Sequence, residues 1–142
     1  MTIEKQTVSV RIAIWENDKE ELSKVRRLVF IEEQKIPKQL EWDGEDELSI
    51  HYLAEIETKI VAVARLKPDG QLGRMAVLKE YRNQGIGHKL LQFIIKNLNN
   101  RKDIYLHAQV SAIPFYKKHG FIECEDIFYE ADIPHKKMLL KD

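Results

Sequence analysis

Cysteine is almost absent from this sequence, which contains only Cys124 among its 142 residues. A single thiol excludes an internal disulfide and fits a reducing compartment. Residues 1–7 are polar and lack the long apolar run of a signal peptide or a membrane-spanning helix. We therefore expect a soluble, cytoplasmic protein.

An excess of charge of either sign is also missing. Lys and Arg total 23, as do Asp and Glu, so the formal net charge is zero. Without a long basic stripe, the sequence favours neither nucleic acid nor an anionic membrane as a partner and indicates a small molecule or a peptide. No internal repeat or low-complexity tract is present, and a hydrophobic content of 44% is enough for one core. We expect a single domain over residues 1–142.

The spacing of apolar residues predicts the order of strands and helices. Alternation over residues 8–14 is typical of a half-buried strand, and Asn17 or Asp18 can cap a helix that continues to about Glu33. The other predicted elements are strands at 50–56, 59–66 and 71–78, a helix at 86–98, a strand at 104–109, a helix at 111–119, and strands at 121–129 and 136–140. The order β-α-β-β-β-α-β-α-β-β predicts an α+β domain with a mixed sheet.

The stretch from Val77 to Leu91 connects a predicted strand to a predicted helix through a glycine-containing turn. Gly85 and Gly87 tolerate unusual dihedrals and place no side chain between the backbone amides and a ligand. The start of the helix adds unpaired N–H groups and the positive end of the helix dipole, and Arg82 adds a fork of donors. The stretch therefore predicts an anion-binding loop.

Two nucleotide-binding motifs do not fit this loop. The Walker pattern G-x-x-x-x-G-K-[ST] is absent. The dinucleotide pattern G-x-G-x-x-G is not completed, because Leu90 stands where the third glycine belongs.

Two motifs together resemble one family. The sequence Arg82-Asn-Gln-Gly85-Ile-Gly87 after a strand resembles the acetyl-CoA pyrophosphate loop of the GNAT superfamily of N-acetyltransferases. The block Ala112-x-x-Phe115-Tyr116-x-x-x-Gly120-Phe121 resembles the next block of that family. The order of elements also fits its acyl-CoA N-acyltransferase fold. Shorter matches resemble the small ElaA-like branch: Glu33-Gln34, Pro37, His51-Tyr-Leu53 and Ile133-Pro-His135.

The resemblance implies an enzyme that moves an acetyl group from acetyl-CoA to a primary amine, by direct attack in a ternary complex. It implies backbone contacts to the pantetheine arm along one strand and a grip on the pyrophosphate by the following loop. The residues implied in cofactor binding are Met75, Ala76, Val77, Arg82, Asn83, Gln84, Gly85, Ile86, Gly87 and His88.

The resemblance also implies catalytic roles. Tyr116 stands where GNAT enzymes commonly carry a tyrosine that protonates the CoA thiolate, although it could instead only pack the short helix with Phe115. Glu33, where the substrate-side loop of the family begins, is our first choice as general base, and a solvated carboxylate at the end of a helix is the alternative.

Other reactive side chains favour structural interpretations. His51, His107 and His135 could face the cleft, but an ordinary hydrogen-bonded histidine in a strand explains each of them. Cys124 has no adjoining histidine or nucleophile-elbow sequence and is expected to be a buried or strand-lining thiol. No spacing of His, Cys and carboxylates predicts a metal site.

Residues 38–49 are acidic and aperiodic, which predicts a loop. The five carboxylates between Glu41 and Glu47 would attract a cationic amine, unless they only form a solvated loop.

Three alternatives are open at this point. The chain could be a non-catalytic acyl-CoA-binding or sensing module. The acceptor could be a lysine side chain or an N-terminus of a protein instead of a small amine. The last two strands leave an edge that could pair between two subunits in a homodimer.

Overall fold

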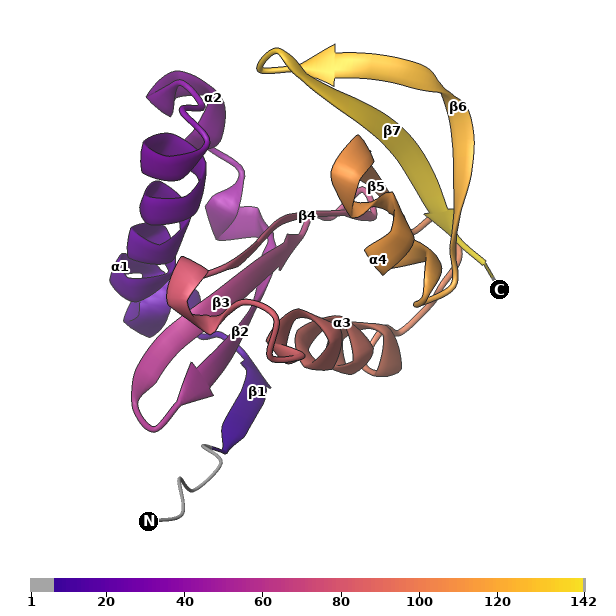
Figure 1. Cartoon of the computed structure of the whole chain (residues 1–142). Coiled ribbons are helices and arrows are strands. Elements are labelled where there is room, and N and C mark those ends of the chain that lie inside the picture. Colours follow the sequence, from indigo (N-terminus) through magenta and orange to yellow (C-terminus); the bar gives the residue numbers. More distant parts are fainter. Residues whose placement is uncertain (1–6, 142) are drawn as a thin grey trace.

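The computed structural model describes residues 7–141 and contains one mixed sheet of seven strands in the order β1-β2-β3-β4-β5-β7-β6 (Figure 1). The strands are β1 (Val8–Ile12), β2 (Ile50–Ile56), β3 (Lys59–Leu66), β4 (Gln71–Val77), β5 (Tyr105–Gln109), β6 (Phe121–Glu130) and β7 (Ile133–Leu140). The α-helices are α1 (Trp15–Arg26), α2 (Lys38–Glu41), α3 (Ile86–Lys96) and α4 (Ile113–Lys117). The predicted fold class and order of the main elements are confirmed. The extent of the domain, residues 1–142, stays a prediction.

Helix α1 begins earlier than its sequence predicts. The N-cap is Ile14, and the Asp18 carboxylate accepts a hydrogen bond from the Ile14 amide at 2.8 Å. Asp18 also pairs with Arg11 of β1 at 2.9 Å. The predicted caps, Asn17 and Asp18, lie inside the helix instead of before it. The Asp18 carboxylate still accepts a hydrogen bond from an amide at the start of the helix, but from within its first turn.

Beyond Arg26 the first helix continues as a wider π-helix from Arg27 to Glu33. The Gln34 amide donates to the Val29 carbonyl, five residues back, at 3.0 Å. Such π-helical turns are rare and occur often at functional sites. Here the last turns bring Phe30 and Gln34 to the border of a cavity.

The core forms where helices cover both faces of the sheet. Every residue of β3 after Lys59 is buried, which requires packing on both sides of that strand. Helices α1 and α3 both pack against β3 and flank the sheet in Figure 1. None of the helices within residues 7–141 is long and apolar enough to cross a membrane.

The sheet divides between β4 and β5. These two strands are parallel and pair at only two positions, Gln71 with Tyr105 and Leu72 with Leu106. Past Leu72, β4 pairs only with β3 and contains a bulge, in which Arg74 and Met75 lie opposite Ala64. Arg74 has a φ of 50°. The bulge and the loss of pairing separate β4 from β5 as they extend (Figure 1).

Candidate active site

The loop before α3 presents a run of unpaired backbone donors. The amides of the six residues Asn83–His88 donate to no acceptor among residues 7–141, and the first amide of this helix with a backbone partner is that of Lys89, which bonds to the Gly85 carbonyl at 3.0 Å. Gly85 has a φ of 80°, and the space where its Cβ would stand is open. Amides freed in this way form a binding surface for an anion.

Packing fixes the direction of α3 beneath this loop. Ile86, Leu90, Leu91 and Ile94 form its buried face, as their spacing predicts. The positive end of the helix dipole is thereby held at the six amides. The predicted anion-binding loop therefore has the required geometry in residues 83–88.

The side chain of Arg82 is already occupied. Its Nε donates to the Val77 carbonyl at 2.9 Å, and its two Nη atoms bond both oxygens of Glu33 at 2.6 and 2.7 Å. This pair joins the end of the π-helix to the anion-binding loop. The hydrogen bonds from Arg82 lower the pKa of the Glu33 carboxyl. A carboxylate held in this way is a poor proton acceptor.

His88 has a partner that the sequence does not reveal. Its Nδ1 lies 2.7 Å from Nε2 of His119, which follows α4. Burial, together with His88 and Lys118, lowers the pKa of His119. Because the two rings bond to each other, His88 contributes to the loop through its free amide, while its ring joins α3 to the end of α4.

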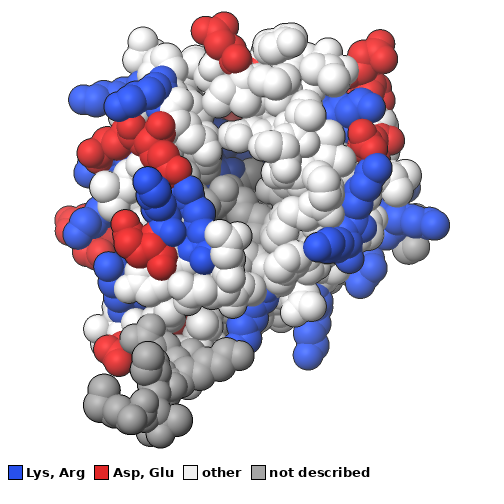
Figure 2. All heavy atoms as spheres, viewed as in Figure 1, with Lys and Arg blue, Asp and Glu red and all other residues white. Residues whose placement is uncertain are grey.

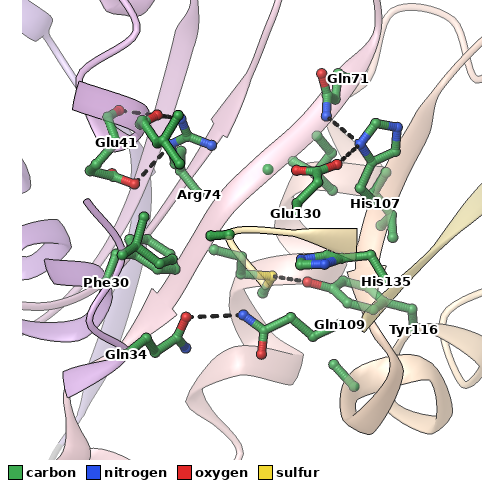
Figure 3. A pocket seen from close by; sticks show the side chains of 18 residues that line it. Phe30, Gln34, Glu41, Gln71, Arg74, His107, Gln109, Tyr116, Glu130 and His135 are labelled. Carbon is green, nitrogen blue, oxygen red and sulfur yellow. Dashed lines mark hydrogen bonds and ion pairs between the residues drawn. The ribbon is translucent and has the colours of Figure 1, made fainter. Parts of the chain in front are cut away.

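A cavity of about 570 Å³ opens where β4 and β5 separate. In Figure 2 the corresponding face is hollowed near its centre, bordered mainly by uncharged residues. The walls are the π-helix, α2, β4, β5, α4 and the β6–β7 turn, and Figure 3 shows Phe30 and Gln34 facing Gln109 and Tyr116 across the space. Gln109 donates to Gln34 at 3.0 Å. This bond crosses from β5 to the end of the π-helix.

Tyr116 borders this cavity from α4. Within the part of the chain that the structure describes, its hydroxyl has one partner, the Met75 sulphur at 3.8 Å, which is a weak acceptor. Burial raises the pKa of Tyr116 to about 12. The phenol therefore keeps its proton near neutral pH, and no strong acceptor among residues 7–141 competes for it.

The residues predicted to follow the pantetheine arm lie beside the bulge of β4. Met75 lines the cavity, Ala76 is buried, and the Val77 carbonyl holds Arg82. The structure thus brings Met75 of β4 and Tyr116 together at the cavity. The loop of residues 83–88 follows the same strand in the chain.

The acidic segment forms ion pairs instead of a solvated loop. It contains α2 and a short 3₁₀ turn at Asp46–Leu48. Three of its carboxylates alternate with three arginines in a closed ring, with nitrogen–oxygen distances of 2.7 to 3.2 Å. In order around the ring, the members are Glu41, Arg26, Asp46, Arg65, Asp43 and Arg74.

This ring changes the electrostatic expectation for the acidic segment. Arg26 and Glu41 are each only 2% exposed, and each carboxylate of the ring has two arginine partners. Equal numbers of opposite charges cancel at a distance. The hypothesis that these carboxylates draw a cationic amine to the cleft is therefore not supported by their contacts.

The three strand histidines differ in their surroundings. His51 is buried, stacks on Trp15, and bonds to the Asp46 carbonyl, as a structural histidine does. His135 borders the cavity, with Nδ1 bonded to the Ile133 carbonyl at 2.7 Å. His107 also borders the cavity and bonds to the Glu130 carboxylate at 2.6 Å.

The other predicted features lie elsewhere. Cys124 is a free, partly buried thiol within β6. Within residues 7–141, no group of three or more His, Cys, Asp and Glu side chains is placed to hold a metal ion.

Comparison with known proteins decides the family. Residues 17–141 match the family model described as the acetyltransferase (GNAT) domain. The chain belongs to the GNAT acetyltransferase family. Membership implies acyl transfer from acyl-CoA.

Relatives of this GNAT protein support the assignment. The uncharacterised N-acetyltransferase YjcF of Bacillus subtilis is 35% identical over 81% of this chain and 86% of its own length. An acyl-CoA N-acyltransferase from Pseudomonas aeruginosa is 27% identical, covers 96% of this chain and 100% of its own, and has a TM-score of 0.81. Escherichia coli ElaA is 25% identical, with a TM-score of 0.81 and coverage of 94% and 98%.

The residues present fit a CoA ester. The six free amides would receive phosphate oxygens, and the separation of β4 from β5 leaves room for a narrow arm that leads to the cavity at Met75 and Tyr116. A φ of 80° at position 85 strains a side chain, most of all a β-branched one, so glycine suits this turn.

The general-base role of Glu33 stays a prediction, and its contacts favour positioning Arg82 instead. We expect Glu33→Gln to lower kcat by less than about 10-fold, whereas loss of a general base costs roughly 10²–10⁴-fold. Steady-state kinetics with acetyl-CoA and an amine would measure this, with Glu32→Gln as the neighbouring exposed control. A loss of 10²-fold or more in kcat, with unchanged CoA affinity, would support Glu33 as the base.

Proposed function

We propose that this protein is an N-acetyltransferase that moves the acetyl group of acetyl-CoA to a primary amine by direct attack in a ternary complex. The observation that carries the proposal is the continuity of the site. The free amides of residues 83–88 lie on the loop that follows β4, and β4 also lines the cavity bordered by Tyr116, whose hydroxyl bonds only weakly, to the Met75 sulphur, within residues 7–141. The cavity, of about 570 Å³, would leave space for a second substrate beside the thioester.

The site supplies the parts that aminolysis of a thioester requires. Backbone groups of Met75, Ala76 and Val77 would hold the arm of the cofactor, and residues 82–88 its pyrophosphate. The amine nitrogen attacks the thioester carbon, forming the C–N bond. The C–S bond then breaks, Tyr116 gives its proton to the departing sulphur, and the nitrogen loses a proton that restores the phenol. No covalent acyl-enzyme is needed, and Cys124 lies outside the residues that line the cavity.

The direct test is release of free CoA thiol. The protein is incubated with acetyl-, propionyl- or butyryl-CoA and a panel of small amines, amino acids and lysine-containing peptides. We expect thiol release that depends on both substrates and is fastest with acetyl-CoA. The control is Gly85→Val, whose branched side chain is incompatible with a φ of 80° and occupies the open space over the loop.

The alternatives give different results in the same assay. CoA binding without amine-dependent thiol release would indicate a non-catalytic binding or sensing module. Release with peptides but not with small amines would indicate a protein acetyltransferase. Faster turnover of a longer acyl-CoA would contradict acetyl specificity and leave the acyltransferase assignment in place.

A further inference from the structure

Glu130 differs from the other carboxylate that lines the cavity. The Glu41 carboxylate is buried between Arg26 and Arg74 in the ion-pair ring. Glu130, at the end of β6, is 49% exposed, and its ion-pair partner among residues 7–141 is His107. Figure 3 shows the Glu130 carboxylate beside the cavity, between its space and the His107 ring. Glu130 is therefore the cavity carboxylate that no arginine neutralises directly.

The position of His107 follows from the divergence of the strands. Leu72 and Leu106 form the last pair between β4 and β5, so His107 is the first residue of β5 beyond that pairing. Leu106 and Ala108 are buried on one face of β5, whereas His107 and Gln109 lie on its opposite, partly exposed face. His107 thus stands where the cleft begins. Its ring packs edge-on against Phe128 at 4.9 Å between ring centres.

The contact between the two side chains determines which of their atoms carry hydrogen. Nδ1 of His107 lies 2.6 Å from Oε1 of Glu130. This hydrogen bond lowers the pKa of the Glu130 carboxyl, which remains ionised near neutral pH. A carboxylate only accepts, so Nδ1 carries the hydrogen and Nε2 retains a lone pair. The dyad then bears one negative charge and can take up one proton to become an imidazolium–carboxylate pair.

We propose that His107 and Glu130 form the acceptor subsite, in which Glu130 binds the ammonium form of a primary aliphatic amine and His107 takes up the proton that the amine loses. One N–H bond of the ammonium breaks and its proton passes to the imidazole, which leaves an electron pair on nitrogen that attacks the thioester carbon. As the C–S bond breaks, the thiolate takes a proton from Tyr116, and the nitrogen loses its second proton, which restores the phenol. This inference rests on the proposed N-acetyltransferase function.

Other titratable and charged groups surround the dyad. Arg74 and His135 line the same cavity. Tyr105 lies beside His107, and Lys137 of β7 lies over the Tyr105 ring. A neighbouring pocket of about 250 Å³ adds Asp43, Arg65 and Lys67. Asp43, Arg65 and Arg74 are ring members that pair with one another. A His135→Gln variant is included to separate the two cavity histidines.

The test compares two amines of similar size. Ethylamine is protonated at neutral pH, and trifluoroethylamine is largely neutral there, so only ethylamine has a charge for the carboxylate to bind and must lose a proton before its nitrogen can attack. We expect His107→Gln to lower kcat/KM for ethylamine by roughly 10²–10⁴-fold and to lower that for trifluoroethylamine by less than about 10-fold. The loss for ethylamine should diminish as the pH approaches the amine's own pKa, near 10.

Glu130→Gln should act mainly on binding. We expect it to raise KM for ethylamine by roughly 10–100-fold and to change KM for trifluoroethylamine by only a few-fold, since a hydrogen bond to a charged group is lost. The control is Glu125→Gln on the same strand, a carboxylate that is 67% exposed and 3.9 Å from Lys137. It should stay within about twofold of the wild type. His135→Gln should not show the ethylamine-selective loss that is expected of His107→Gln.

The outcomes separate this inference from the proposed function. Equal losses on both amines, or no loss in His107→Gln, would overturn the subsite while the wild-type enzyme still turns over. No amine-dependent CoA release by the wild type would overturn the proposed function and the subsite with it. CoA affinity and melting temperature are measured for every variant. If His107→Gln does not fold, Glu130→Gln decides by itself, because its amine-selective change in KM requires only the carboxylate.

Discussion

Replacing Tyr116 by phenylalanine is expected to lower kcat by roughly 10²-fold and to leave the dissociation constant of CoA within about twofold. General acids contribute roughly 10²–10⁴-fold, and the lower end applies here. Burial raises the pKa of Tyr116 to about 12, whereas an ordinary thiol titrates near 8.5. The phenol therefore gives up its proton less readily than a matched acid would. Burial of the leaving thiolate narrows this gap by raising its pKa as well.

Tyr116→Phe removes the hydroxyl and keeps the packing of the ring. The ring of Tyr116 packs edge-on against Phe115 and Phe121, with centroids 5.1 and 5.9 Å away, and phenylalanine keeps both contacts. Within the described part of the chain, the one hydrogen bond that this variant loses is the weak one to the Met75 sulphur. Rapid-quench or steady-state kinetics would give kcat, and calorimetry the CoA affinity. Tyr129→Phe, at a tyrosine that is 70% exposed, is the control.

A different pattern would contradict the role of Tyr116. If Tyr116→Phe weakened CoA binding more than it slowed turnover, the hydroxyl would serve the cofactor site instead of the departing thiolate. An unchanged kcat would indicate that the tyrosine only packs α4 against the sheet.

Replacing Glu41 by glutamine is expected to lower the free energy of unfolding by about 3–5 kcal/mol, the cost of breaking a buried ion pair by removing one partner. Glu41 pairs with Arg26 at 2.7 Å and with Arg74 at 3.1 Å, and the variant leaves three arginines facing two carboxylates. Burial raises the pKa of Glu41, although both arginines oppose this. Because a domain is stable by only about 5–15 kcal/mol, the change is a large fraction of the total.

Urea unfolding would measure this effect, with the m-value showing whether the unfolded state has changed. Glu45→Gln is the matched control in the same acidic segment. Glu45 is 46% exposed and pairs with Lys67 at 2.7 Å, so its loss should cost about 0–1 kcal/mol. If Glu41→Gln cost no more than Glu45→Gln, the ring would be no stronger than a surface ion pair.

The ring also has a consequence for the cleft. Arg74 carries the bulge of β4, and its φ of 50° is a strained conformation that the ion pairs to Glu41 and Asp43 hold in place. The bulge lies where β4 and β5 diverge, so the ring fixes one wall of the cavity. Its charges stabilise the geometry of the site, in place of the long-range attraction that the acidic sequence had suggested.

The sequence by itself determined the features of this protein that depend on residues close together in the chain. The loop at 83–88 and the helix after it form within a few turns of chain, so glycines and apolar spacing were sufficient to predict both. The order of elements followed from the same local periodicities. The predicted position of the helix cap was wrong, because Asp18 accepts hydrogen bonds from the Ile14 amide and from Arg11 of β1 while it lies inside the helix.

Tertiary structure alone decided the contacts that complete the site. Glu33 meets Arg82 across 49 residues, and His107 meets Glu130 across 23. The end of the π-helix brings the first pair together, and the strand order β5-β7-β6 brings the second. No local pattern marks Glu130 as a partner or shows that three arginines pair with three of the five carboxylates in the acidic segment. Propensity and spacing act along the chain, whereas the pairing of charges and the opening between β4 and β5 depend on how the whole sheet is assembled.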